Sequence, residues 1–112
     1  MKTTEQGRLA EAAVTELLKA RGYKILDQNW RTRLCEIDIV AAKGKIAYFV
    51  EVKYRASNNQ GDGFEYITPR KLSQMSFASE VWVQENSWSG DYRLMAAAVT
   101  GADAEDIELV EL

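Results

Sequence analysis

Two short motifs carry the residues of this chain that are best suited to chemistry, 36–38 (Glu-Ile-Asp) and 51–53 (Glu-Val-Lys). Each motif lies in an apolar, β-branched run that is typical of a buried strand. Carboxylates beside such runs lose hydration when a sheet packs, so they need a compensating partner. A divalent metal ion beside a phosphodiester is the partner that fits these residues best.

The chemistry of such a site would be metal-dependent hydrolysis. Asp38 and Glu51 would hold Mg²⁺ or Mn²⁺, with the backbone carbonyl of Val52 and waters completing the coordination shell. The metal would lower the pKa of a bound water and neutralise charge on the scissile phosphate. Lys53, on the same strand face as Glu51, would orient the attacking water or stabilise charge developing on phosphorus.

Composition narrows the alternatives. The chain has no histidine, which excludes Ser-His-Asp and Cys-His nucleophile systems and histidine-bearing zinc sites. The one cysteine, Cys35, cannot form an internal disulfide, which agrees with a reducing compartment. Residues 1–6 lack the apolar segment of a secretory signal, and no apolar run is long enough to cross a bilayer. We therefore expect a cytoplasmic protein without membrane contact.

The length and charge of the chain indicate the number of domains and the kinds of partner it can bind. A chain of 112 residues predicts one domain, residues 1–112, with an ordinary core. The net charge of −3 does not favour a nucleic-acid binder. However, basic residues dominate 19–55 and acidic ones dominate 72–112, which permits one basic face. On charge alone, an unevenly charged solvated surface is the simpler interpretation.

Periodicity and turn chemistry predict an α/β fold. A helix is expected over 4–21, stopped by Gly22, and a second over 69–85, with Thr68 as N-cap and Pro69 at its first position. A bend is expected at 27–29, a tight turn at 43–44 and a linker-like stretch at 56–66. The order α-β-β-β-α-β-β indicates a mixed sheet flanked by helices. The expected strands are 23–26, 34–42, 45–54, 93–100 and 106–111.

The acids can meet only if the central hairpin has the right parity. An even-numbered loop at 43–44 would place Asp38 opposite Phe49 and Glu36 opposite Glu51. Asp38 and Glu51 would then be diagonal neighbours, about 7–8 Å apart, and could share one metal ion. An odd-numbered loop would put Asp38 on the other face, and the site would fail.

Glu11 in the first helix is a further candidate. On a helical wheel it borders the apolar stripe that includes Ala10, Val14 and Leu18. A carboxylate at that border can reach over the sheet, to bind metal or to hold Lys53. The alternative is an ordinary solvated residue that flanks the stripe.

At these motifs the chain resembles the PD-(D/E)XK nuclease superfamily, whose signature is an acid on one strand and (D/E)-x-K on the next. More closely, it resembles the YraN-like family of uncharacterised endonuclease-like proteins, which are related to archaeal Holliday-junction resolvases. The resemblance covers about two thirds of the chain. The matching residues are Gly7, Glu11, Gly22, Tyr23, Ile25, Leu26, Asn29, 36–41, 49–55, Ile67 and Lys71.

The resemblance implies a restriction-endonuclease-like αβββαβ core with four active-site positions. It also implies action on structured or branched DNA, for which a symmetric substrate such as a four-way junction would call for a homodimer. Two positions depart from the family pattern: Cys35 replaces a usual glycine, and Met95 replaces an acid on the penultimate strand. The implied active-site residues are Glu11, Asp38, Glu51 and Lys53.

Alternatives remain for both the residues and the function. Asp38, Glu51 and Lys53 could form a structural salt-bridge cluster instead of a metal site. Three functions are therefore open: a magnesium-dependent nuclease, a non-catalytic nucleic-acid-binding module of the same fold, and an interaction protein that docks a basic partner. The candidates for phosphate contacts are Arg55 and Lys71, followed by Arg31 and Arg33.

Overall fold

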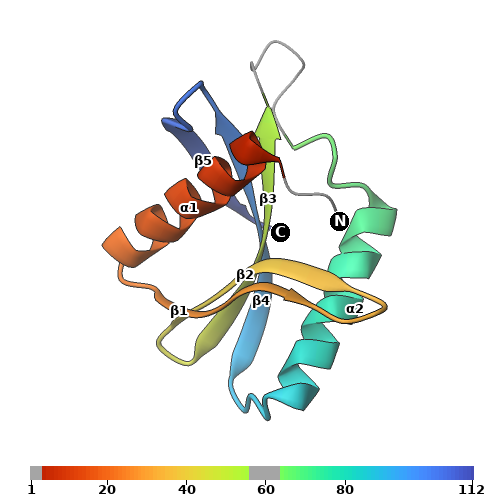
Figure 1. The fold of residues 1–112 in the computed structure, drawn as a ribbon. Helices are drawn as coiled ribbons and strands as arrows, with labels where there is room; N and C mark the ends of the chain where they lie inside the picture. Colours follow the sequence, from red (N-terminus) through yellow and green to blue (C-terminus); the bar gives the residue numbers. More distant parts are fainter. Residues whose placement is uncertain (1–3, 56–63) are drawn as a thin grey trace.

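The computed structural model describes residues 4–55 and 64–112 (Figure 1). The expected mixed α/β fold with an αβββαβ core is confirmed, and one further strand follows it. Most of the linker-like stretch at 56–66 lies outside the described residues. The elements are α1 (Glu5–Ala20), β1 (Lys24–Arg31), β2 (Glu36–Lys43), β3 (Ile46–Arg55), α2 (Pro69–Glu85), β4 (Asp91–Thr100) and β5 (Asp106–Glu111).

The five strands form one sheet in the order β1-β2-β3-β4-β5. The β3–β4 pair is parallel, and the other three pairs are antiparallel. A parallel pair needs a crossover, and α2 supplies it between β3 and β4. The two helices lie on opposite sides of the sheet (Figure 1).

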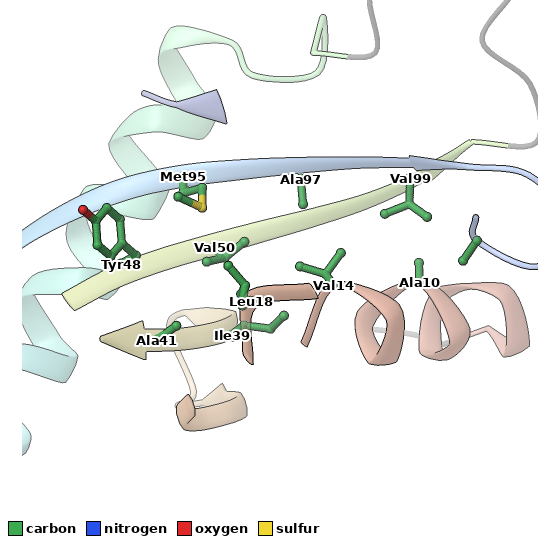
Figure 2. Close-up of a cluster of buried hydrophobic side chains, with 11 residues drawn as sticks. Ala10, Val14, Leu18, Ile39, Ala41, Tyr48, Val50, Met95, Ala97 and Val99 are labelled. Carbon is green, nitrogen blue, oxygen red and sulfur yellow. The ribbon is translucent and has the colours of Figure 1, made fainter. Parts of the chain in front are cut away.

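The first core lies between α1 and the sheet. Ala10, Val14 and Leu18 are fully buried at helical spacing and pack on side chains that alternate along β2, β3 and β4. Figure 2 shows these helical residues facing the strands. The strand residues in this core are Ile39, Ala41, Tyr48, Val50, Met95, Ala97 and Val99.

The second core lies between α2 and the opposite face of the sheet. Phe49 and Trp82 meet edge to face, with ring centroids 5.5 Å apart, beside Ala78 and Val40. The Trp82 Nε1–H group donates a hydrogen bond to Asp27 Oδ2 of β1 at 3.1 Å, so the end of α2 is tied to the edge strand. Trp82 is buried, so it belongs to this core.

The helix ends follow the local sequence signals. Thr4 caps α1 by accepting a hydrogen bond from the Gly7 N–H group, and Gly22 beyond its end has a φ of 91°. Thr68 caps α2 by accepting from the Lys71 N–H group, and Pro69 is its first residue. Both predicted helices are therefore confirmed in type and position.

The expected bend at 27–29 is wrong, because β1 continues through these residues to Arg31. The strand absorbs the turn-forming residues in two irregularities: the register shifts between Ile25 and Asp27, and Asn29 adopts a φ of 50°. An edge strand tolerates such irregularities, since only one of its sides is paired.

The central hairpin has an even-numbered loop, as the site requires, but the predicted register is wrong by two residues. Lys43 pairs with Ile46, so Gly44 and Lys45 form the turn, and Val40 rather than Asp38 lies opposite Phe49. Gly44 has a φ of 64°, which places the residue that favours left-handed backbone at the first loop position.

Neither of the two described helices is both long and apolar enough to cross a membrane.

Candidate active site

The β2–β3 pair separates at the acidic motifs. Its ladder runs from the turn to the Ile39–Val50 pair and ends there. Just beyond this pair, the Val52 N–H group donates a hydrogen bond of 2.8 Å to Asp38 Oδ2. The Asp38 carboxylate thus accepts a hydrogen bond from a backbone N–H group that would have paired with β2 if the ladder had continued. We call this region, formed by Asp38, Glu51 and Val52, the open end of the hairpin.

The alternation of side chains in β2 also breaks at Asp38. Ile37 and Ile39 are two residues apart and would share a face in a regular strand. Instead, Ile37 packs in the second core and Ile39 in the first, on opposite faces of the sheet. The two acids of this motif also differ in burial, because Glu36 is exposed whereas Asp38 is buried.

Asp38 is a buried acid in a negative environment. Its side chain is only 5% exposed, and no described basic residue forms an ion pair with it. Burial, reinforced by the nearby Glu51 carboxylate, raises its pKa to about 7, although the Val52 N–H bond opposes the shift. Glu11 and Glu36 add smaller effects in the same direction as Glu51. Asp38 would therefore gain free energy from a nearby cation.

Glu11 reaches this region from α1, as its place on the helical wheel allowed. It is half-buried, and desolvation raises its pKa, while a hydrogen bond with the Asn29 side chain opposes the rise. Glu36 and Glu51 raise the pKa of Glu11 further. Asn29 was not predicted as a site residue. Asparagine is one of the few residues that tolerate its positive φ.

Lys71, rather than Lys53, neutralises Glu51. Lys71 Nζ lies 3.1 Å from Glu51 Oε2, and both side chains are partly buried. Lys53 is exposed, and it forms no ion pair with a carboxylate of the described residues. The structure thus brings together Glu11, Asp38 and Glu51, and leaves the Lys53 ammonium on the rim.

Tyr66, which precedes α2, is a second site residue that sequence reasoning missed. Burial raises its pKa, and the charges of Glu51 and Asp38 raise it further, whereas Arg55 lowers it. Its hydroxyl is buried and has no hydrogen-bond partner within the described part of the chain. The Lys53 Nζ atom lies 6.0 Å from the centre of its ring. Tyr66 therefore stays protonated and can donate a hydrogen bond beside the acids.

A groove of about 750 Å³ leads away from Glu51, between the loop that joins β1 to β2 and the first half of α2. We call it the basic groove. Three of the four predicted phosphate-binding residues line it, and Arg55 does not. Its charged lining residues are Arg31, Arg33, Arg70, Lys71, Glu36 and Glu51, and its other lining residues are Thr32, Leu34, Cys35, Ser73, Gln74, Met75 and Phe77.

The donor atoms of the open end suit a hard cation. Within residues 4–55 and 64–112, no group of three or more acidic or cysteine side chains is arranged to hold a metal ion. Magnesium, however, often uses only one or two protein carboxylates together with waters and substrate phosphates. Asp38 and Glu51 satisfy that smaller requirement. With only oxygen donors here, Mg²⁺ and Mn²⁺ fit better than zinc or copper.

The fold and the site together define a class of protein: a five-stranded mixed α/β domain whose sheet opens at a buried carboxylate beside a basic groove. The chain belongs to the uncharacterised protein family UPF0102, whose model matches residues 10–103. This agrees with the resemblance to the YraN-like family, while the wider PD-(D/E)XK placement stays a prediction.

Relatives in other bacteria match most of the chain. A UPF0102 protein of Leifsonia xyli is 37% identical over 99% of this chain and 95% of its own length. One from a Sulfurihydrogenibium species is 35% identical over 90% of this chain and 89% of its own. A third, from Fusobacterium nucleatum, is 36% identical over 84% of this chain and 78% of its own.

Proposed function

We propose that this protein is a metal-dependent nuclease of the PD-(D/E)XK type that hydrolyses phosphodiester bonds in structured or branched DNA. The observation that carries the proposal is the buried Asp38 carboxylate at the open end, without a basic partner among the described residues. Holding an acid there destabilises the fold unless a cation joins it, and a metal ion would serve that purpose.

The residues at the open end of the hairpin would bind the metal ion together with Glu11. Asp38 and Glu51, with the Val52 backbone carbonyl, would hold Mg²⁺ or Mn²⁺, and Glu11 would join them directly or through water. The bound ion would supply an activated water and neutralise charge on the scissile phosphate. The Val52 N–H group fixes Asp38 Oδ2, which leaves Oδ1 without a hydrogen bond from the described residues and available as a ligand.

Three residues would contact the substrate rather than the metal in this proposal. Lys53 is exposed on β3, two residues after Glu51, and would stabilise charge that develops on the phosphate oxygens. Tyr66 would donate a hydrogen bond to a phosphate oxygen, since its hydroxyl has no hydrogen-bond partner within the described part of the chain. Lys71, which pairs with Glu51, would contact a phosphate if a metal ion took over that carboxylate.

A cleavage assay on DNA of different shapes tests the proposal. Purified protein is incubated with labelled four-way junctions, flaps, duplexes and single strands in the presence of Mg²⁺ or Mn²⁺. We expect metal-dependent cleavage, and we expect Asp38→Asn or Lys53→Met to slow it about 100- to 1,000-fold. Asp106→Asn, at an exposed acid on β5, is the matched control and should leave the rate unchanged.

Each contrary outcome selects a different function. Cleavage that Asp38→Asn leaves unchanged would come from a contaminating enzyme and would remove the proposal. Salt-dependent DNA binding without products under either metal would identify a non-catalytic binding module of the same fold. The absence of any affinity for nucleic acid at moderate salt would leave an interaction protein.

A further inference from the structure

Two exposed apolar side chains lie in the basic groove, where a purely electrostatic surface would have none. Leu34, in the loop between β1 and β2, is 81% exposed, and Phe77, on α2, is 47% exposed. Both line the groove together with its four basic residues. Large apolar groups left in water beside cations often mark a surface that a ligand covers.

The excess of basic side chains in the groove favours an anionic ligand. Four basic side chains line it against two carboxylates, and one of these, Glu51, is already paired with Lys71. Arg31, Arg33 and Arg70 are exposed, so each can reach a ligand. An apolar peptide would cover Leu34 and Phe77 but would leave these guanidinium groups without partners.

An aromatic ring beside cations matches unpaired nucleotides better than a duplex. In a duplex the faces of the bases are stacked on one another, so a protein ring can contact them only at an end or an opening. In a single strand each base offers a face, and stacking on an aromatic side chain combines with phosphate contacts to Arg and Lys. Phe77 supplies such a ring, and Leu34 supplies an apolar contact from the other wall of the groove.

The groove also has a defined end. Glu51 belongs both to its lining and to the open end of the hairpin, and Lys71, which also lines the groove, pairs with Glu51, so a strand lying in the groove leads to the acidic residues. Its volume is that of a small-molecule pocket, which limits the occupant to a few nucleotides. The occupant is therefore a short unpaired stretch next to the bond that would be cut.

We propose that the basic groove binds an unpaired strand of DNA, with one base stacked on Phe77 and the neighbouring phosphates on Arg31, Arg33, Arg70 and Lys71. This inference rests on the proposed nuclease function and narrows its substrates to DNA that carries single-stranded segments, such as flaps, forks and open junctions. Fully paired linear duplex is excluded from the groove.

Binding measured without metal separates this inference from cleavage. Fluorescence anisotropy in EDTA compares a single strand, a duplex with an overhang, a blunt duplex and an RNA strand of the same sequence. We expect the first two to bind more tightly than the blunt duplex, and the RNA to bind no more tightly than the DNA. Phe77→Ala should weaken binding to the single strand and the overhang about 5- to 100-fold, and leave duplex affinity unchanged.

Three further variants keep the test specific. Phe77→Tyr retains a ring and should restore the affinity for the single strand. Leu9→Ala removes an equally exposed apolar side chain from α1 and should have no effect. Arg33→Gln should reduce the slope of log K against log salt by about 0.7, the value for one phosphate contact on a single strand.

The outcomes distinguish this inference from the function on which it rests. Equal affinity for blunt duplex, tighter binding to RNA, or a Phe77→Ala variant that binds the single strand normally would overturn the groove assignment. Cleavage that depends on Asp38 could still stand in each of these cases. Conversely, Phe77-dependent binding without cleavage of any substrate would support the groove assignment and contradict the proposed nuclease activity.

Discussion

The two ends of the β2–β3 hairpin are built from the same two strands and yet have opposite character. At the turn end the ladder is continuous, and Ala41, Ala42 and Ala47 are buried on it. At the open end the ladder has stopped, Asp38 accepts the Val52 N–H bond, and carboxylates replace alkyl groups. Backbone pairing and apolar packing stabilise one end, whereas the other end holds polar groups that lower stability.

The comparison shows how a small sheet can hold reactive groups. The paired end fixes the positions of β2 and β3, so the separation further along needs no support from the residues that occupy it. Those residues are then free to be acidic, at a cost in stability that the two cores offset. A substitution at the turn end should therefore change stability, and one at the open end should change chemistry and pH dependence.

The largest effect should come from emptying the second core beneath the paired strands. Phe49→Ala removes a buried ring that lies 5.5 Å from the Trp82 ring and 5.6 Å from the Tyr92 ring. We expect the free energy of unfolding to fall by about 3–5 kcal/mol in urea denaturation. Phe77→Ala, at an exposed ring on α2, is the control and should change it by less than about 0.5 kcal/mol. Similar losses for the two variants would contradict the assigned core.

Stability should depend on pH through Asp38. The pKa of this carboxyl is about 7 in the folded protein against an ordinary value of 3.8, so between these values only the folded state holds the proton. The free energy of unfolding should therefore fall as the pH rises through this window and become flat above about pH 7. The loss between pH 5 and pH 8 should be roughly 2–3 kcal/mol.

Denaturation curves of Asp38→Asn measure this contribution directly. The variant cannot ionise at this position, so it should lose most of the slope and be more stable than the wild type at pH 8. Asp106→Asn should keep the wild-type slope, because that acid is exposed. A wild-type protein whose stability rises from pH 5 to pH 8 would show that the carboxylate is well compensated without metal.

A substitution in the turn between β2 and β3 should lower the free energy of unfolding less than the two effects above. Gly44→Ala forces a side chain into a φ of 64°, although the added Cβ would meet no atom within 4 Å. The cost is therefore that of the backbone conformation alone, about 1–2 kcal/mol in thermal or urea unfolding. Gly44→Asn should cost less, since asparagine tolerates this conformation. Loss of cleavage in a folded Gly44→Ala variant would mean that the two ends are not independent.

The smallest effect should be a gain in metal affinity. Lys71→Met removes the ammonium group 3.1 Å from Glu51 Oε2, so it removes a cation that competes for the carboxylate. Calorimetric titration with Mn²⁺ should show binding about three- to tenfold tighter. Lys45→Met, in the turn at the far end of the hairpin, should leave the affinity as it was. Weaker binding in the Lys71 variant would place the ion away from Glu51.

Local signals were enough to predict most of the fold. Thr68 and Pro69 mark a helix start by chemistry that acts within one turn, and the limits of β5 were predicted to the residue. The end of β1 was predicted too early, because 27–29 contains turn formers, whereas pairing with β2 on both sides of Asn29 keeps this stretch within the strand. The predicted register of the β2–β3 hairpin was wrong because two-residue loops at 43–44 and at 44–45 both have an even number of residues. The requirement for an even-numbered loop therefore does not distinguish them.

Less of the candidate site than of the fold could be predicted from the sequence. The type and spacing of Asp38 and Glu51 indicated acids on adjacent strands, but not that the strands separate between them. Asn29 and Tyr66 reach the site through an irregular edge strand and a loop, which no periodicity describes. The pairing of Lys71 with Glu51 depends on how the first turn of α2 lies relative to β3, which is a tertiary property.

The hydrogen bond between Trp82 and Asp27 joins α2 to β1, the two elements that carry the opposite walls of the basic groove. Neither Trp82 nor Asp27 lines the groove, so the bond restrains α2 and β1 relative to one another without occupying the binding surface. A ligand held between two elements that are already joined costs less free energy in reshaping the protein than one that must bring them together.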